Sequence, residues 1–283
     1  MNIGLSIVCG VLTASGFGIA DFAAKLSTDR MGFLRTGLYL QIIGSFFVLP
    51  LALPQLYRVL IDPWVSLAAI CLGVINAIGT LFLYKGFEVG RLSIVSPIAS
   101  TAPLVGVLLA IAFLGEILTK ELLLGISLII SGVVLVSLQP SHGWGSKVAA
   151  GTAFAIGFML CGGFLLFGLK PVTAAFGPFL PVLIMRWVGI LVLAVPAIRT
   201  ESKGLSSALK PVLPIAFFDT FANVAYTLGV SFGTVTVVAP LGGMFSSVTV
   251  LLAWLFLKEK PSRHQILGFV VILLGIVTLG LFT

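Results

Sequence analysis

The chain has 283 residues, of which 59% are hydrophobic and only 9% are charged, and its formal net charge is +7. A soluble domain carries about 25% charged residues, so this composition excludes a water-soluble globular fold and indicates a protein embedded in lipid. The basic residues stand singly between apolar runs and form no basic face, so we expect no nucleic-acid partner.

Ten apolar segments are long enough to cross a bilayer, which takes about 20 residues of helix. In chain order they are predicted at residues 3–24, 33–53, 64–84, 92–114, 120–138, 149–169, 178–198, 211–231, 234–257 and 264–282. Barrel strands would be shorter and would alternate in polarity, so these continuous apolar runs favour helices. The connections are short, which predicts that sequential helices run antiparallel beside one another.

The second half of the chain repeats the first half. The stretch that begins at Gly90 aligns with the stretch that begins at Gly233, and the first predicted helix aligns more weakly with the sixth. The matched pairs are Pro97 and Pro240, Glu116 and Glu259, Gly125 and Gly268, Gly132 and Gly275, and Gly18 and Gly163. We therefore predict two five-helix domains, residues 1–140 and 141–283.

An odd number of helices in each repeat has a geometric consequence. The second copy must enter the membrane from the opposite side, so the two copies are inverted. Inverted repeats are a common transporter design, in which the substrate site lies near the midplane between the halves. The predicted fold class is an all-α integral membrane protein whose ten transmembrane helices form two inverted five-helix repeats around a central cavity.

Two matching polar stripes are candidates for contact with a cargo. Each stripe places its members on one face of a helix, at spacings of three or four residues. The third and eighth helices that carry them are repeat partners, so the stripes are expected to face each other across the cavity and to offer hydrogen bonds to a polar metabolite. The predicted substrate-binding residues are Asn76, Thr80 and Tyr84 on one helix and Asp219, Asn223 and Tyr226 on the other.

Asp219 and Asp21 are acids inside predicted membrane segments, and both are candidates for a proton or charge relay. Ionisable groups in a membrane are costly, and they mark functional sites or structural pairs. Asp219 would bind a cationic group of the cargo or carry a proton; the alternative is a structural carboxylate paired with Arg186. For Asp21 the structural alternative is a pair with Lys25, one helical turn later.

Other polar or helix-breaking residues are assigned mainly to structure. Arg35 and Arg186 are interpreted as interfacial anchors, since long basic side chains reach toward the headgroups. Glu116 and Glu259 lie in helix connections and are expected to orient those turns. Because proline interrupts helical hydrogen bonding, three prolines are candidate gate hinges, with a purely packing role as the alternative: Pro97, Pro103 and Pro240.

At this level of detail the sequence resembles the EamA-like, ten-helix branch of the drug/metabolite transporter superfamily. The residues that carry the resemblance are Pro103, Gly115, Glu116, Gly125 and Gly132, the recurring frame Glu259, Gly268 and Gly275, and the paired arginines Arg35 and Arg186. The resemblance implies two five-helix bundles around a central cavity, small metabolites such as amino acids as cargo, export as the usual direction, and cytoplasmic termini.

The leading functional hypothesis is a secondary transporter, an exporter or exchanger, that moves a small organic metabolite such as an amino acid by alternating access. No Walker-type nucleotide motif occurs in the sequence, so protons or a counter-substrate are the expected energy source. A channel-like or structural membrane protein is the alternative, and a membrane-embedded enzyme is the third reading, which we do not favour. We expect a monomer or weak homodimer in the lipid bilayer of a bacterial inner (plasma) membrane.

No cofactor or metal is expected. The cysteines Cys9, Cys71 and Cys161 and the histidines His142 and His264 show no metal-ligand spacing.

Two criteria give opposite predictions for the membrane orientation. Lysine and arginine concentrate in the loops opposite the termini, so the positive-inside rule places both termini outside, whereas the family resemblance implies termini in the cytoplasm.

Overall fold

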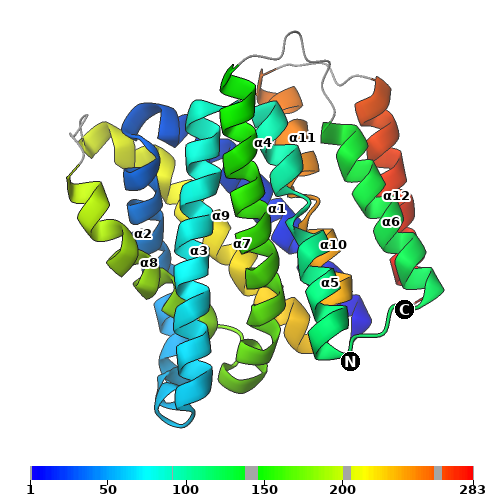
Figure 1. The fold of residues 1–283 in the computed structure, drawn as a ribbon, viewed down its shortest axis with the longest axis horizontal. Helices are drawn as coiled ribbons and strands as arrows, with labels where there is room; N and C mark the ends of the chain where they lie inside the picture. The colour runs from blue at the N-terminus through cyan, green and yellow to red at the C-terminus, as the bar shows by residue number, and fades with distance from the viewer. Residues whose placement is uncertain (1, 91, 138–145, 200–204, 258–262, 283) are drawn as a thin grey trace.

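The computed structural model describes residues 2–90, 92–137, 146–199, 205–257 and 263–282 (Figure 1). These residues form helices and short connections, with no strand among them. The elements are α1 (Ile3–Met31), α2 (Phe33–Ala52), the 3₁₀ segment η1 (Leu53–Leu60), α3 (Pro63–Val89), α4 (Leu92–Ala99), α5 (Ala102–Leu114), α6 (Lys120–Ser137), α7 (Ser146–Phe176), α8 (Leu180–Ile198), α9 (Leu205–Phe232), α10 (Val235–Gly242), α11 (Phe245–Leu257) and α12 (Arg263–Phe282).

The predicted fold class is confirmed as an all-helical membrane fold. In two places a pair of shorter helices, α4 with α5 and α10 with α11, takes the position of one predicted helix. Six helices of the described chain are long and apolar enough to cross a membrane by length and composition: Ile3–Met31, Phe33–Leu60, Pro63–Val89, Gly151–Phe176, Leu180–Ala197 and Val212–Phe232.

Local chemistry explains where several helices begin and end. The side chain of Asn2 accepts a hydrogen bond from the amide of Leu5, and Asp62 caps the amides of Trp64 and Val65 in the same way. Helix α1 extends about two turns beyond its predicted end. Its charged last turns remain helical because Lys25 and Asp29 pair at 2.8 Å across one turn.

The second half of the chain enters the bundle from the end opposite to the first. Helices α1 and α7 begin at opposite ends, whereas the start of α1 and the end of α12 lie at the same end (Figure 1). The most extensive contacts join the two halves: α1 packs along α9, α3 along α7, α2 along α8 and α6 along α12. Exchanging each helix for its repeat partner reproduces this set of pairs, as expected for inverted repeats.

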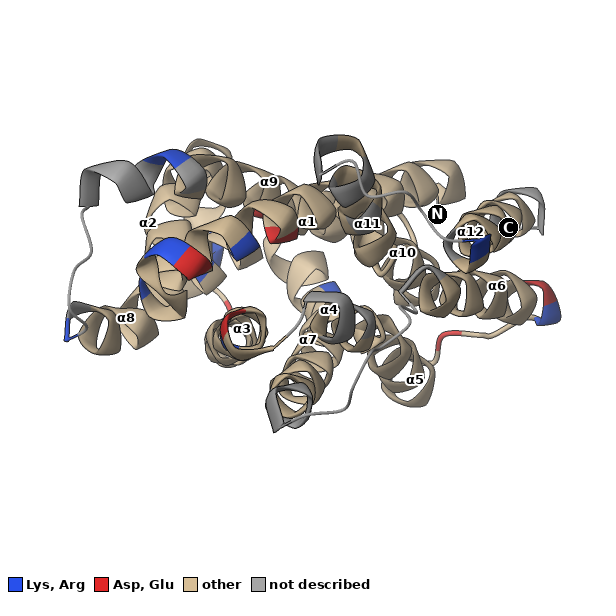
Figure 2. Ribbon diagram, turned by 90° about the horizontal axis from the view of Figure 1, so that it is seen from above, with Lys and Arg blue, Asp and Glu red and all other residues tan. Residues whose placement is uncertain are grey.

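This arrangement corrects the expectation that sequential helices pack mainly beside one another, because few contacts join α1 to α2 or α8 to α9. The pair α2–α8 lies at one edge of the bundle and the pair α6–α12 at the opposite edge (Figures 1 and 2). Between them lie α1, α3, α7 and α9, and the predicted polar site residues lie on α1, α3 and α9.

In the pair α6–α12, equivalent residues of the two repeats make equivalent close contacts. A Cβ atom on Gly132 would lie 2.7 Å from Cγ1 of Ile272, and a Cβ atom on Gly275 would lie 2.8 Å from Cγ1 of Ile129. Gly132 and Gly275, like Ile129 and Ile272, are matched positions of the repeat. Glycine at these sites lets the two helices approach closely, as is common between membrane helices.

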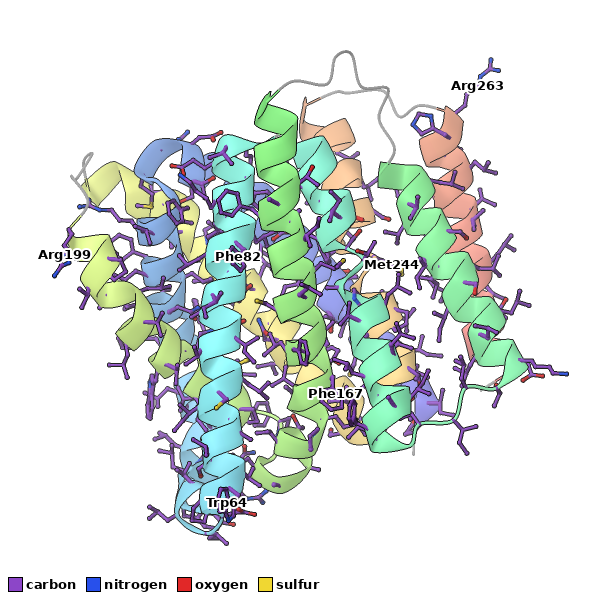
Figure 3. All side chains as sticks on the ribbon, viewed as in Figure 1. Trp64, Phe82, Phe167, Arg199, Met244 and Arg263 are labelled. Carbon is purple, nitrogen blue, oxygen red and sulfur yellow. The ribbon has the colours of Figure 1, made fainter. Side chains whose placement is uncertain are left out.

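The outer surface is apolar and carries few charges, as expected for a surface in contact with lipid. Few positions of the ribbon carry charge (Figure 2), and large apolar side chains point outward along the whole height of the bundle (Figure 3). Trp64 is 81% exposed at one end of the bundle, and Arg263 lies at the other end (Figure 3). The protein is therefore an integral membrane protein.

Candidate functional site

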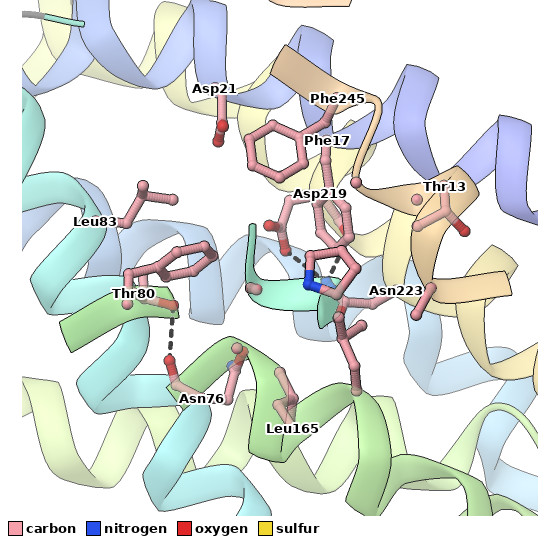
Figure 4. Close-up of a pocket in the computed structure, with 18 of the residues that line it drawn as sticks. Thr13, Phe17, Asp21, Asn76, Thr80, Leu83, Leu165, Asp219, Asn223 and Phe245 are labelled. Carbon is pink, nitrogen blue, oxygen red and sulfur yellow. Dashed lines mark hydrogen bonds between the residues drawn. The ribbon is translucent and has the colours of Figure 1, made fainter. Parts of the chain in front are cut away.

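A central cavity of about 90 Å³ lies between the two halves (Figure 4). Both repeats contribute to its wall: helices α1, α3 and α5 come from the first half, and α7, α9, α10 and α11 from the second. Its polar wall residues are Thr13, Asp21, Asn76, Thr80, Tyr84, Asp219 and Asn223. The remaining wall is apolar and includes Phe17, Phe158 and Phe245.

Helix α3 contributes the whole of its predicted stripe. Asn76, Thr80 and Tyr84 line the cavity together, because a spacing of four residues returns each side chain to the same helical face. The hydroxyl of Thr80 donates to the carbonyl of Asn76 at 2.9 Å (Figure 4). Within the described chain, the amide side chain of Asn76 and the hydroxyl of Tyr84 have no hydrogen-bond partner, so both are available to a cargo.

Helix α9 contributes only part of its predicted stripe. Asp219 and Asn223 line the cavity, and the side-chain amide of Asn223 donates to Oδ2 of Asp219 at 3.1 Å. Tyr226 does not line the cavity. Its hydroxyl donates to the carbonyl of Leu166 on α7 at 2.7 Å, and the residue is 1% exposed, so its place is the interface between α7 and α9.

Arg186 lies behind the cavity and neutralises Asp219. Its Nη2 pairs with Oδ2 of Asp219 at 2.5 Å, and its Nη1 donates to Oε1 of Gln41 on α2 at 3.0 Å. The interpretation of Arg186 as an interfacial anchor is wrong, since the residue is 1% exposed and lies nearly two turns inside α8. A guanidinium can occupy this depth because a carboxylate and an amide from two other helices compensate it.

Asp21 also lies on the cavity wall, but it has no such partner. The residue is 6% exposed, and its side chain points into the cavity near Leu83 and Phe245 (Figure 4). The proposed pair with Lys25 is absent, because the ammonium of Lys25 instead contacts Asp29 at 2.8 Å and the carbonyl of Phe87 at 2.9 Å. Among the described residues no donor or cation contacts the Asp21 carboxylate.

The two helix breaks meet beside the cavity. The first lies at Ser100 and Thr101, between α4 and α5, and the second at Gly243 and Met244, between α10 and α11. These are equivalent positions of the repeat, and a Cβ atom on Gly243 would lie 2.7 Å from Cγ of Pro103. Pro103 is in the first turn of α5, where proline fits readily. Pro97 and Pro240 lie within α4 and α10, close to the breaks.

Glu116, in the first repeat, contacts the second repeat at the end of the bundle where the termini lie. Its carboxylate accepts hydrogen bonds from the amides of Val235 and Thr236, each at 2.9 Å, and pairs with Lys170 at 2.7 Å. The first two contacts cap the amino-terminal end of α10. The expectation that Glu116 orients its own turn missed this long-range contact; its repeat partner Glu259 lies outside the described residues.

The cavity can therefore offer hydrogen bonds and one unpaired carboxylate to a small molecule. In the described part of its wall no lysine, arginine or histidine is present, and no group of metal-ligating side chains occurs among the residues the structure describes. The apolar majority of the wall and its few convergent polar groups are typical of a small-molecule site.

Comparison with known proteins agrees with this arrangement. The sequence model of the EamA-like transporter family matches residues 4–138 and 148–281, one match in each half. An uncharacterized protein of Methanocaldococcus jannaschii is 33% identical over 134 residues, which are 47% of this chain and 97% of that protein. A solved crystal structure of a protein with 16% identity shares the fold, with a TM-score of 0.77 over 96% of this chain and 95% of that one. The chain therefore belongs to the EamA-like transporter family, whose members are membrane transporters of the drug/metabolite type.

Proposed function

We propose that the protein is a secondary carrier that moves a small organic metabolite across its membrane by alternating access, as an exporter or an exchanger. The observation that carries the proposal is the cavity between the inverted halves, whose wall comes from both repeats. Two halves with equivalent contacts can close the cavity at either end with the same chemistry. An amino acid is the example of cargo that the family resemblance implies.

The arrangement of the broken helices supports this mechanism. Discontinuous helices at the midplane are a recurring feature of substrate sites in carriers with inverted repeats. Here the breaks between α4 and α5 and between α10 and α11 touch each other beside the cavity. Each pair of half-helices can change its angle at the break, so we propose that Pro97, Pro103 and Pro240 act at or beside the hinges of the two gates.

Energy for transport would come from a gradient, in the form of protons or a counter-substrate, as the lack of a nucleotide-binding motif in the sequence suggests. We further propose an inner bacterial membrane as the location and a monomer or weak homodimer as the working form.

The predicted residues that line the cavity, and so remain candidates for contact with the cargo, are Asn76, Thr80, Tyr84, Asp219 and Asn223.

The experiment that tests the proposal is counterflow in proteoliposomes. Purified protein is first screened by thermal stabilisation against a metabolite library, since a ligand that binds only the folded state raises its stability. Vesicles are then preloaded with the best compound, and uptake of its labelled form is measured. We expect uptake that saturates and is accelerated by internal compound. Uptake that rises linearly with concentration and ignores the internal compound would instead indicate a channel.

A further inference from the structure

We infer that the cargo carries a net positive charge on an amine or quaternary ammonium group, and that this group binds the Asp21 carboxylate inside an aromatic-rimmed part of the cavity. The inference rests on the proposed carrier function and deepens it by naming the class of substrate. In this inference Asp21, and not Asp219, is the carboxylate that binds the charged group of the cargo.

The two cavity carboxylates differ in their partners. Asp219 shares its charge with Arg186, which contacts it at 2.5 Å, so together they form a neutral pair. Asp21 is 6% exposed and contacts no hydrogen-bond donor or cation in the described part of the chain. A lone buried carboxylate is costly to keep, and membrane proteins retain such groups chiefly where function requires them. In its deprotonated form Asp21 therefore presents an uncompensated negative charge to whatever enters the cavity.

The surroundings of Asp21 suit an organic cation. Phe17, Tyr84, Phe158 and Phe245 line the same cavity, and the rings of Phe17 and Phe245 pack edge to face with centroids 6.4 Å apart. Figure 4 shows the Asp21 carboxylate on the side of the cavity where Phe17 and Phe245 lie. Aromatic faces attract ammonium groups, and most strongly where water is excluded.

The same wall argues against the other classes of cargo. An anion would find no lysine, arginine or histidine on the described wall of the cavity. A zwitterionic amino acid would satisfy Asp21 with its ammonium group but would leave its carboxylate without a cationic partner. A metal ion needs several converging oxygen, nitrogen or sulfur ligands, and no such group of side chains is found within the described residues.

A proton would compete with such a cargo for Asp21. The ionisable groups that face Asp21 are Asp219 on α9 and Tyr84 on α3, with Arg186 of α8 behind Asp219; Lys25 lies one turn further along α1 and is held by Asp29. Protonation of Asp21 removes the charge that the ammonium group recognises. Binding of a cation whose own charge cannot change should therefore weaken as the pH falls.

The test uses three phenyl compounds of similar size that differ in charge: 2-phenylethyl-trimethylammonium, zwitterionic phenylalanine and anionic 3-phenylpropionate. Binding to purified full-length protein is measured in detergent by ligand-dependent thermal stabilisation at several pH values. We expect the ammonium compound to bind at least about tenfold more tightly than the other two. In Asp21→Asn this binding should weaken about tenfold or more, the size expected for loss of an ion pair, and should become independent of pH.

Asp29→Asn is the matched control, since Asp29 lies on the same helix and its side chain is exposed at the bundle end; it should bind like the wild type. Three results would each overturn the inference: unchanged cation binding by Asp21→Asn, equal or tighter binding of the zwitterion or the anion, or no binding of the ammonium compound. If any of these occurs while counterflow of another metabolite succeeds, the carrier proposal stands and only the cationic class is lost.

Discussion

The substitutions Asp219→Asn and Asp21→Asn make the same chemical change at two carboxylates on the wall of one cavity, yet we expect only the first to lower the stability. The first removes the charge that compensates Arg186, whose side chain is 2% exposed. The second removes a charge that no described residue compensates. The pair of variants therefore separates a carboxylate that holds helices together from one that is kept for a ligand.

The magnitude at Asp219 follows from what remains after the substitution. Breaking a buried ion pair costs about 3–5 kcal/mol, because the surviving charge stays buried without a partner. An asparagine amide still accepts one hydrogen bond from the guanidinium, and the Asp219 side chain is 18% exposed toward the cavity. We therefore expect the low end, about 3 kcal/mol, which corresponds to a fall in Tm of roughly 6–9 °C.

At Asp21 the expected change is zero or a gain of up to about 1 kcal/mol, since a neutral amide is less costly to bury than an unpaired carboxylate. Both variants are purified in the same detergent and unfolded thermally, with tryptophan fluorescence as the readout. The double variant Arg186→Met with Asp219→Leu serves as a further control and should recover most of the lost stability, because neither charge is then left alone. Wild-type stability of Asp219→Asn, or an equal loss in both single variants, would refute the reasoning.

Three further predictions follow from the packing and the charge distribution. Glu116→Gln should lower the stability by about 1–2 kcal/mol in the same thermal assay, because a charged cap of α10 is lost, whereas Glu121→Gln at an exposed position should not. Gly132→Leu should cost about 1–3 kcal/mol, because its side chain would strike Ile272; Gly4→Leu, near open space, is the control that should leave Tm unchanged. The basic residues gather in the loops opposite the termini, so the positive-inside rule predicts that an alkaline phosphatase fused to the C-terminus is active and a fluorescent protein fused there is dark; the reverse result would give the cytoplasmic termini that the family resemblance implies.

The overall helix pattern could be predicted because charge and hydropathy change sharply where a membrane helix ends. The two helix breaks could not be predicted as ends, because the apolar runs at 92–114 and 234–257 continue through them. Only the proline positions gave a signal there. The repeat, once aligned, also predicted the inversion of the two halves, since that step depends on the number of crossings and not on any single contact.

The polar wall of the cavity was predicted in part, and the differences have physical causes. Helical spacing located the residues of α3 and the first two of α9, but Tyr226 lies about two turns further along α9 than Asp219, and its hydroxyl contacts α7 instead. Arg186 was assigned to the membrane surface because a lone basic residue usually marks an interface. Its partners Asp219 and Gln41 come from helices 33 and 145 residues away in sequence, and local patterns carry no information about contacts at such separations.

The most direct test of the account is whether the cavity can be reached from both sides of the membrane in turn. Thr80 lines the cavity, so Thr80→Cys is prepared in a background without Cys9, Cys71 and Cys161 and placed in oriented vesicles. A membrane-impermeant thiol reagent is added to one side or the other, with and without saturating cargo. Alternating access predicts labelling from either side and protection from both sides by cargo. Labelling from one side alone under every condition, or labelling that cargo does not reduce, would contradict it.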